Sequence, residues 1–372
     1  MTVHVVTTAS NLATVNSSMA SGDFMQFTAG TYSISSVLNL VNGCSYIGNP
    51  GAILSTTAAV DIFDIVTGTN NNIYISGLTF DETNHLSPNA AIFISGNNGA
   101  VGSGVNNITI SNCTFQNIGG TTNSILGYQM DYCRIDNNLF SNCYQGVSLI
   151  NNDASNTHGY ISVSGNTFRA MARMGIETQG NSGTAIFHLH VNNNTFYDIQ
   201  NEESISMVEG FNTGVDIQCC NNAFWSCASA IEMSNANATM AGNIFTNCNN
   251  CFLLADNPSS MVYGNIMRGC NNSNIFGQDG GGWAGSQYIG YNMINGAVVF
   301  GNSSGTYGTA APATTGFSGT AFTIPDYVPQ TLAQLDALFA SGQAAGTITP
   351  QYVRNLFAAL ANPAYLNGST YP

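Results

Sequence analysis

The sequence contains no lysine, and only 6% of its residues are charged. Five arginines stand against 19 carboxylates, which gives a formal net charge of −14. A surface of this charge repels nucleic acid and anionic membranes, so neither is an expected partner. Solvation must come from glycine, asparagine, serine and threonine instead. A neutral, hydroxyl-rich partner such as a polysaccharide or oligosaccharide fits this composition.

Two further absences concern membranes and export. No stretch reaches the roughly 18 consecutive apolar residues that a membrane helix needs. Residues Met1 to Ser10 lack the basic start and the apolar run of a secretory signal. We therefore expect cytoplasmic production without a Sec signal peptide in this chain, followed by release through another route such as host lysis. A signal that was trimmed off is the alternative.

Phenylalanines recur along the chain at intervals of 21 to 35 residues. An asparagine lies two residues before most of them, an apolar residue lies five before each, and a cysteine often follows three residues later. The unit has the form h-x-x-N-x-F-x-x-C, followed by a turn and a second apolar strand. The recurring positions are Phe80, Phe115, Phe140, Phe168, Phe196, Phe224, Phe245 and Met267.

Such a repeat predicts an all-β solenoid, a parallel β-helix, because a single coil cannot bury its apolar side alone. Coils stack about 4.8 Å apart, so equivalent residues form columns through the core. The ten cysteines fit these columns as small buried apolar residues. Disulfide pairing and redox activity are the alternatives. We expect no zinc site at Cys219–Cys220 or at Cys248 and Cys251, because no histidine pair accompanies them.

Two N-terminal segments resemble a known family. Residues Gly22–Tyr32 resemble the G-D-x-I-x(3)-G-x-Y entrance of the pectate-lyase-like superfamily, and Ser45–Gly51 resembles the x-L-x-G-x-G segment that follows it. The asparagine-containing coils from about 70 to 300 are similar to the repeats of that family. The resemblance implies a right-handed parallel β-helix. It does not fix the activity, because members include polysaccharide lyases, galacturonase-type hydrolases, epimerases, fructotransferases and phage tailspikes.

The two ends of the chain differ from the repeat. Residues 10–20 predict a short amphipathic helix that caps the N-terminal end of the solenoid, so that 1–302 form one β-helix domain. Residues 303–328 are rich in serine, glycine and threonine and predict a linker. Residues 329–372 predict a small helical C-terminal segment. Its phrase G-T-I-T-P-Q-Y-V-R-N-L-F is similar to a motif of phage tail proteins, and a capping helical hairpin is the alternative.

The catalytic patterns of the superfamily are missing, so the site must be located from the register of the coils. Neither the clustered aspartates of a pectate-lyase calcium site nor the N-x-D…D-D…G-H-G…R-x-K pattern of galacturonase-type hydrolases is present. We expect no metal and no cofactor. Aligning the coils on the phenylalanines instead gives one outward column of residues, Ser148, Glu177, Ser206, Glu232 and Leu253.

Five of the six glutamates lie between residues 177 and 232. Glu177 and Glu232 are two coils apart, roughly 9.6 Å along the backbone, near the carboxyl separation of about 6.5 to 9.5 Å in inverting glycosidases. We predict them as the catalytic pair, one as a general acid and the other activating water. Solvated surface carboxylates are the alternative. Glu209 or Glu203 is the replacement candidate, and Arg173 and Glu202 are predicted substrate contacts.

A second outward column precedes the asparagines and contains Arg134, Ser162, His190 and Gln218. His188 points the same way as His190 in an alternating strand, so both are candidates for binding sugar hydroxyls or for acid/base roles. Asp216 is a weaker candidate. A polar outer sheet face is the alternative. Trp225 and Trp283 are candidate platforms on which a sugar ring stacks.

These features favour a carbohydrate-active enzyme, a glycoside hydrolase or a related glycosyl-transferring enzyme. A homotrimeric phage tailspike, in a virion or released outside the cell, is one expected setting. A tail or adhesin module that binds glycan without cleaving it is the first alternative. A polysaccharide lyase is the second, and it needs a base such as His190 together with a group that neutralises a uronate.

Overall fold

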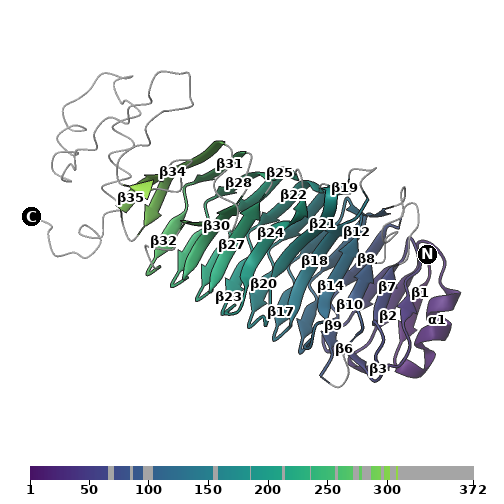
Figure 1. Cartoon of the computed structure of the whole chain (residues 1–372). Helices are drawn as coiled ribbons and strands as arrows, with labels where there is room; N and C mark the ends of the chain where they lie inside the picture. Colours follow the sequence, from purple (N-terminus) through teal and green to yellow (C-terminus); the bar gives the residue numbers. More distant parts are fainter. Residues whose placement is uncertain are drawn as a thin grey trace, which may run out of the picture. The chain divides into compact units, whose positions relative to one another are not determined.

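The chain winds as a right-handed parallel β-helix whose coils contribute strands to three faces (Figure 1). Within each face the strands of successive coils pair in parallel. The computed structural model describes residues 1–65, 71–83, 87–94, 104–153, 158–184, 186–211, 214–234, 236–255, 259–270, 276–278, 286–294, 297–301 and 307–308. All of them belong to one unit, Met1–Ala313. The predicted fold class is confirmed.

The first face begins with β1 (Val3–Val6), which pairs with the strand that opens the first full coil. It continues through β2 (Phe24–Phe27), β5 (Ser45–Gly48), β8 (Ile73–Ser76), β12 (Ile108–Ser111), β16 (Arg134–Asp136), β19 (His158–Ser164), β22 (Ile186–Asn192), β25 (Gly214–Cys220), β28 (Ala236–Ala241), β31 (Ser259–Tyr263) and β34 (Ser286–Ile294).

The second face follows the first after a tight turn in each coil. Its strands are β3 (Gly30–Ile34), β6 (Ala52–Thr56), β9 (Thr79–Asp81), β13 (Thr114–Gln116), β17 (Leu139–Ser141), β20 (Thr167–Arg169), β23 (Thr195–Tyr197), β26 (Ala223–Trp225), β29 (Ile244–Thr246) and β32 (Ile266–Arg268).

The third face completes each coil and carries the predicted carboxylates. Its strands are β4 (Leu38–Asn39), β7 (Phe63–Ile65), β10 (Ala90–Ile94), β14 (Asn123–Tyr128), β18 (Gln145–Asn151), β21 (Ile176–Thr184), β24 (Glu203–Phe211), β27 (Ser229–Ser234), β30 (Asn250–Ala255) and β33 (Phe276–Gln278). A short pair, β11 (Val105–Asn106) and β15 (Met130–Asp131), lies outside these faces.

The phenylalanine column is confirmed as the centre of the core. Each phenylalanine from Phe80 to Phe245 pairs with its equivalent in the next coil, and Met267 follows. Adjacent rings have centroids 4.6 to 4.9 Å apart and lie within 7° of parallel. The ring spacing matches the strand spacing, which explains why one residue type repeats so strictly.

The asparagine ladder hydrogen-bonds one coil to the next. The side chain of Asn166, for example, donates to the carbonyl of Ile135 at 2.7 Å and accepts from the backbone N–H of Asn138 at 2.9 Å. The same pattern runs through Asn138, Asn194, Asn222, Asn243 and Asn265 and continues one coil further, to Asn292. Buried polar turns are therefore satisfied along this part of the solenoid.

All ten cysteines are free thiols, and nine of them are buried. Burial raises the pKa of Cys113 and of Cys133 to about 12, which keeps both thiols neutral. Cys219 extends an apolar column on the first face, where it pairs with Val191 and Met240. The packing interpretation is confirmed for these residues, and no disulfide joins the ten cysteines, all of which lie in the described part of the chain.

A short helix covers the N-terminal coil, as predicted. The segment η1 (Ala9–Asn11) leads into α1 (Leu12–Ser18), which buries Leu12 and Asn16. The amide of Asn16 donates to the carbonyl of Asn39 at 2.7 Å and accepts from the hydroxyl of Tyr46 at 3.0 Å. Among the described residues, no helix has the length and apolar character to cross a membrane.

The last described strands differ from the coils. Strand β35 (Ala297–Gly301) pairs antiparallel with β34, and β36 (Tyr307–Gly308) pairs antiparallel with β35. Strand β36 falls within the residues predicted as a linker. The rest of 303–328 and the predicted helical segment 329–372 lie outside the described residues.

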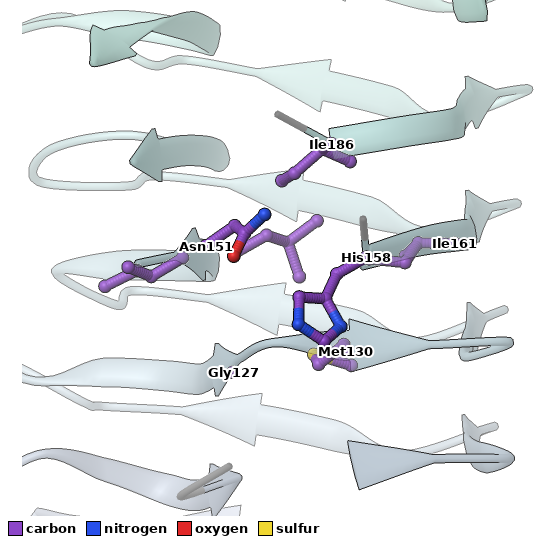
Figure 2. A pocket seen from close by; sticks show the side chains of 8 residues that line it. Gly127, Met130, Asn151, His158, Ile161 and Ile186 are labelled. Atoms are coloured by element: carbon purple, nitrogen blue, oxygen red, sulfur yellow. The ribbon is translucent and has the colours of Figure 1, made fainter. Parts of the chain in front are cut away.

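One buried ionic cluster lies between the third and first faces. The imidazole of His158 lies beside Met130 and Asn151 (Figure 2), next to a cavity of about 10 Å³, roughly the space that one water needs. Its Nδ1 is 2.8 Å from Asp131, and its Nε2 is 3.6 Å from Asp153. Burial lowers the pKa of His158, but hydrogen bonds and charges from both aspartates outweigh burial and raise it.

We expect the contribution of His158 to stability to decrease as the pH rises above the ordinary pKa of histidine. Because its folded-state pKa lies above the ordinary value of 6.5, the contribution is complete below about pH 6.5 and is lost as pH rises through the folded pKa. The melting temperature of His158→Gln should therefore lie further below the wild-type value at about pH 6 than at about pH 8.5. Equal differences at both pH values would contradict this. The control is His190→Gln, which removes a half-buried imidazole that lies 3.8 Å from Asp216.

Candidate functional site

The predicted carboxylate column is present on the third face. Strand pairing aligns Ser148 with Glu177, Glu177 with Ser206, and Ser206 with Glu232. Leu253 follows, also as predicted. The preceding residues, Ile176 and Ile231, are fully buried in the core. Because side chains alternate along a strand, this fixes the glutamates on the outer surface of the sheet.

Glu177 points outward but is only 3% exposed, because neighbouring polar side chains cover it. The amide of Gln145 donates to one carboxylate oxygen, and Ser148 Oγ donates to the same oxygen at 3.2 Å. Gln179 donates to the other oxygen at 2.7 Å. These contacts are all donors, and donors of this kind stabilise a negative carboxylate.

Arg173 joins two carboxylates and fixes one amide. Its guanidinium lies 3.0 Å from Glu177 and 3.0 Å from Glu202, and it donates to the side-chain amide oxygen of Gln145 at 2.8 Å. Burial lowers the pKa of Arg173, but the charges of Glu177 and Glu202 outweigh burial and raise it. Arg173 and Glu202, both predicted as substrate contacts, therefore lie together, and the guanidinium charge is compensated within the protein.

A hollow of about 300 Å³ lies beside this cluster, over β14, β18 and β21. Glu177 and Arg173 form part of its wall, together with the half-buried phenols of Tyr128 and Tyr144. Its other lining residues are Thr121, Asn123, Leu126, Gln145, Ser148, Ile150 and Gln179. Hydroxyl, amide and phenol groups around one carboxylate are the donors and acceptors that sugar hydroxyls match.

The N-terminal half of this hollow was not predicted from the sequence. Leu126 pairs with Ser148, so the outward column extends one coil before the glutamates. Tyr128 pairs with Ile150, which in turn pairs with Gln179. Extending the predicted register one coil toward the N-terminus would have found these side chains. The carboxylates alone gave no reason to do so.

The remaining predicted carboxylates lie beyond the hollow. Glu232 is 9% exposed and accepts a hydrogen bond from Ser206 Oγ at 2.9 Å. Glu203 pairs through its backbone with Ser229, and Glu209 with Gln179. The side chain of Glu209 lies outside the described residues. Glu177 and Glu232 therefore share a column, but the lining of the hollow contains Glu177 and not Glu232.

The predicted histidine column lies on the first face, on a different sheet from Glu177. Arg134, Ser162, His190 and Gln218 align in register as expected. His188 Nδ1 lies 2.8 Å from an oxygen of Asp216, and His190 Nε2 lies 3.8 Å from the same oxygen. The hydrogen bond from His188 lowers the pKa of Asp216. These three residues form a separate polar cluster.

The two tryptophans do not join the carboxylates either. Trp225 lies on the second face, where it pairs with Tyr197 and Thr246. Trp283 lies outside the described residues. Among the residues that the structure describes, no group of three or more histidine, cysteine or acidic side chains is arranged to hold a metal ion.

No protein-family model matches the sequence, and no curated protein matches it. Several solved structures are similar to this chain. The PL6 family alginate lyase AlyGC has a TM-score of 0.52 and 15% identity over 72% of this chain and 38% of its own. Geobacillus virus E2 ORF18 has a TM-score of 0.51 and 13% identity over 77% of this chain and 60% of its own.

The tailspike protein of E. coli bacteriophage HK620 has a TM-score of 0.48 and 14% identity over 74% of this chain and 55% of its own. This chain thus spans less than two thirds of the length of all three proteins. At these identities the similarity shows the fold alone. The chain is a right-handed parallel β-helix, and its solved structural neighbours include pectate-lyase-like β-helix proteins and phage tailspikes.

Proposed function

We propose that the chain binds a neutral polysaccharide in the hollow on the third face and hydrolyses it as a glycoside hydrolase. One observation carries the proposal. Glu177 is a nearly buried carboxylate in the wall of a 300 Å³ hollow whose other polar groups are amides, hydroxyls, phenols and one guanidinium. Ligand sites combine such a concave shape with a few convergent polar groups.

The balance of charge in the hollow favours a neutral sugar. Arg173 is its cation, and both Glu177 and Glu202 already lie 3.0 Å from that guanidinium. A uronate would have to compete with these carboxylates for the same charge. The phenols of Tyr128 and Tyr144 supply the apolar faces and hydroxyl groups with which a neutral sugar ring interacts.

Cleavage needs two carboxyl groups, and the outward column supplies Glu177 and Glu232. They are separated by one coil, that of Ser206, which corresponds to roughly 9.6 Å between backbones. That spacing leaves room for a water molecule, as in inverting enzymes. In this proposal the polysaccharide extends from the hollow along the outward column to Glu232, which lies outside the hollow. Glu177 takes a proton from the water, and the water oxygen bonds to the anomeric carbon as the glycosidic C–O bond breaks. Glu232 gives a proton to the leaving glycosidic oxygen.

A glycan-binding protein without catalysis is the second candidate. The observation that favours it is the number of partners of Glu177, since Gln145, Ser148, Gln179 and Arg173 all donate to its carboxylate. In this second function the carboxylate shapes the hollow and takes no part in chemistry. In that case the protein binds the same sugars and leaves them intact.

Incubation with a panel of neutral and acidic polysaccharides separates these functions. We expect reducing ends to appear with a neutral polysaccharide, without the ultraviolet absorbance of an unsaturated product. Absorbance together with reducing ends would indicate a lyase and would contradict the proposal. Retained binding with neither signal would indicate the non-catalytic function. Heat-denatured protein serves as the control for spontaneous cleavage.

A further inference from the structure

A column of exposed aromatic and cationic side chains runs along the second face, on a different sheet from the hollow. Strand pairing places Arg169, Tyr197, Trp225, Thr246 and Arg268 in consecutive coils. We call these five residues the aromatic strip. Tyr197 is 52% exposed and Trp225 is 38% exposed, so two adjacent coils present large aromatic side chains to solvent.

The two cations of the strip differ from the other described arginines. Four of the five arginines lie among the described residues, and Arg134 and Arg173 are ion-paired. No ion pair of Arg169 or Arg268 occurs within the described part of the chain. Arg169 donates to the hydroxyl of Ser141 at 2.9 Å. The two guanidinium groups therefore carry positive charge that no described carboxylate compensates.

We propose that the aromatic strip is a second carbohydrate-binding site, specific for an acidic oligosaccharide. Arg169 and Arg268 are four coils apart, roughly 19 Å, so they bracket Tyr197 and Trp225. Sugar rings stack on the aromatic faces, and uronate or sulfate groups pair with the guanidinium groups at the two ends. The chain as a whole has a net charge of −14, but the two arginines make this column locally positive and so complementary to an acidic oligosaccharide.

Other anionic ligands fit this surface less well. An extended peptide adds to a sheet through unpaired backbone groups at its edge, but the second-face strands pair with a neighbour on both sides. A single-stranded nucleic acid carries its charges on phosphates, which a sugar separates from the bases that would stack on Tyr197 and Trp225. An acidic oligosaccharide carries its charges on sugar rings that can stack.

Fluorescence of Trp225 tests the proposal directly. The chain has two tryptophans, so Trp283→Phe leaves Trp225 as the single fluorophore. A Glu177→Gln change in the same protein prevents the proposed hydrolysis from consuming the probe. We expect hexagalacturonate to change the emission saturably, with a Kd about tenfold weaker in Arg169→Gln and in Arg268→Gln. Maltohexaose should bind at least about tenfold more weakly than hexagalacturonate.

A control variant on the first face distinguishes binding at the strip from general attraction to arginine. Arg134→Gln should leave the Kd unchanged. Equal binding of both hexasaccharides, or unchanged binding in Arg169→Gln and Arg268→Gln, would overturn the proposal. Tighter binding of oligothymidylate than of hexagalacturonate would also overturn it. An emission change that depends on protein concentration in the absence of ligand would overturn it too, because it would indicate that the strip is a subunit interface. Because no cleavage is measured, a failure of the proposed hydrolase function leaves this result unaffected.

Discussion

Replacing Glu177 by glutamine is expected to lower the rate of polysaccharide cleavage by about 10²- to 10⁴-fold, the range lost when a general base is removed. Glutamine has nearly the same shape, so the hollow and its sugar binding should remain. The amide oxygen can accept from Gln145 and Ser148, which now donate to one and the same carboxylate oxygen, and the Gln179 amide can turn its own oxygen toward the new NH2. Release of reducing ends measures the rate, and equilibrium dialysis with the same polysaccharide measures binding.

The matched control for this variant is Glu82→Gln. Glu82 is 1% exposed, accepts hydrogen bonds from Ser87, and lies outside the lining of the hollow. Burial raises the pKa of Glu82 to about 7, so a neutral amide resembles the form that is already populated near neutral pH. We expect this variant to cleave at the wild-type rate. If it lost as much activity as Glu177→Gln, the loss would reflect folding rather than catalysis.

The second member of the pair is tested in the same assay. Glu232→Gln should also reduce cleavage by at least about 10²-fold, because it removes the proposed proton donor. Glu202→Gln should reduce cleavage less, since Glu202 is 43% exposed and acts only through Arg173. Full activity in both Glu177→Gln and Glu232→Gln would show that the chemistry lies elsewhere or that the protein only binds glycan.

The register of the solenoid was predictable because each residue contacts its equivalent in the neighbouring coils. The spacing of Phe140, Phe168 and Phe196 in the sequence therefore also placed Ser148, Glu177 and Ser206 side by side. Periodicity carries this information only where the side-chain environment repeats from coil to coil. On the third face the repeat alone was enough to locate the column of carboxylates.

Contacts made by long side chains across columns were less predictable. Arg173 reaches Gln145, Glu177 and Glu202, which belong to three different coils, and this depends on the path of its side chain. His188 and Asp216 were predicted as substrate contacts at a second outward column, and Trp225 as a platform for a sugar ring. They lie on the first and second faces, because each coil turns between faces and sequence proximity does not place residues on one sheet.

Asn166→Ala should be among the most destabilising single changes in the chain. It removes two hydrogen bonds to Asn138, one to the carbonyl of Ile135 and one to Asn194. Alanine leaves the Ile135 carbonyl and the backbone N–H of Asn138 without these buried partners, whereas the Asn138 amide keeps its hydrogen bond to Ile110. At about 1 to 3 kcal/mol for each of the two groups, we expect a loss of about 4 kcal/mol in all. With an unfolding entropy of about 2.1 cal/mol/K per residue over the unit Met1–Ala313, this lowers the melting temperature by roughly 6 °C.

The matched control for this change is Asn201→Ala. Asn201 is exposed and donates to the carbonyl of Ala172 at 2.9 Å, so water can replace its hydrogen bond. Its loss should cost under about 1 kcal/mol. Calorimetry of both variants measures the difference. If Asn166→Ala melted within about 1 °C of Asn201→Ala, the ladder would contribute little to stability. A large difference would show that the asparagines repeat strictly because they hydrogen-bond buried backbone groups of the turns between coils. Removing an exposed asparagine does not leave such groups without a partner, because water replaces it.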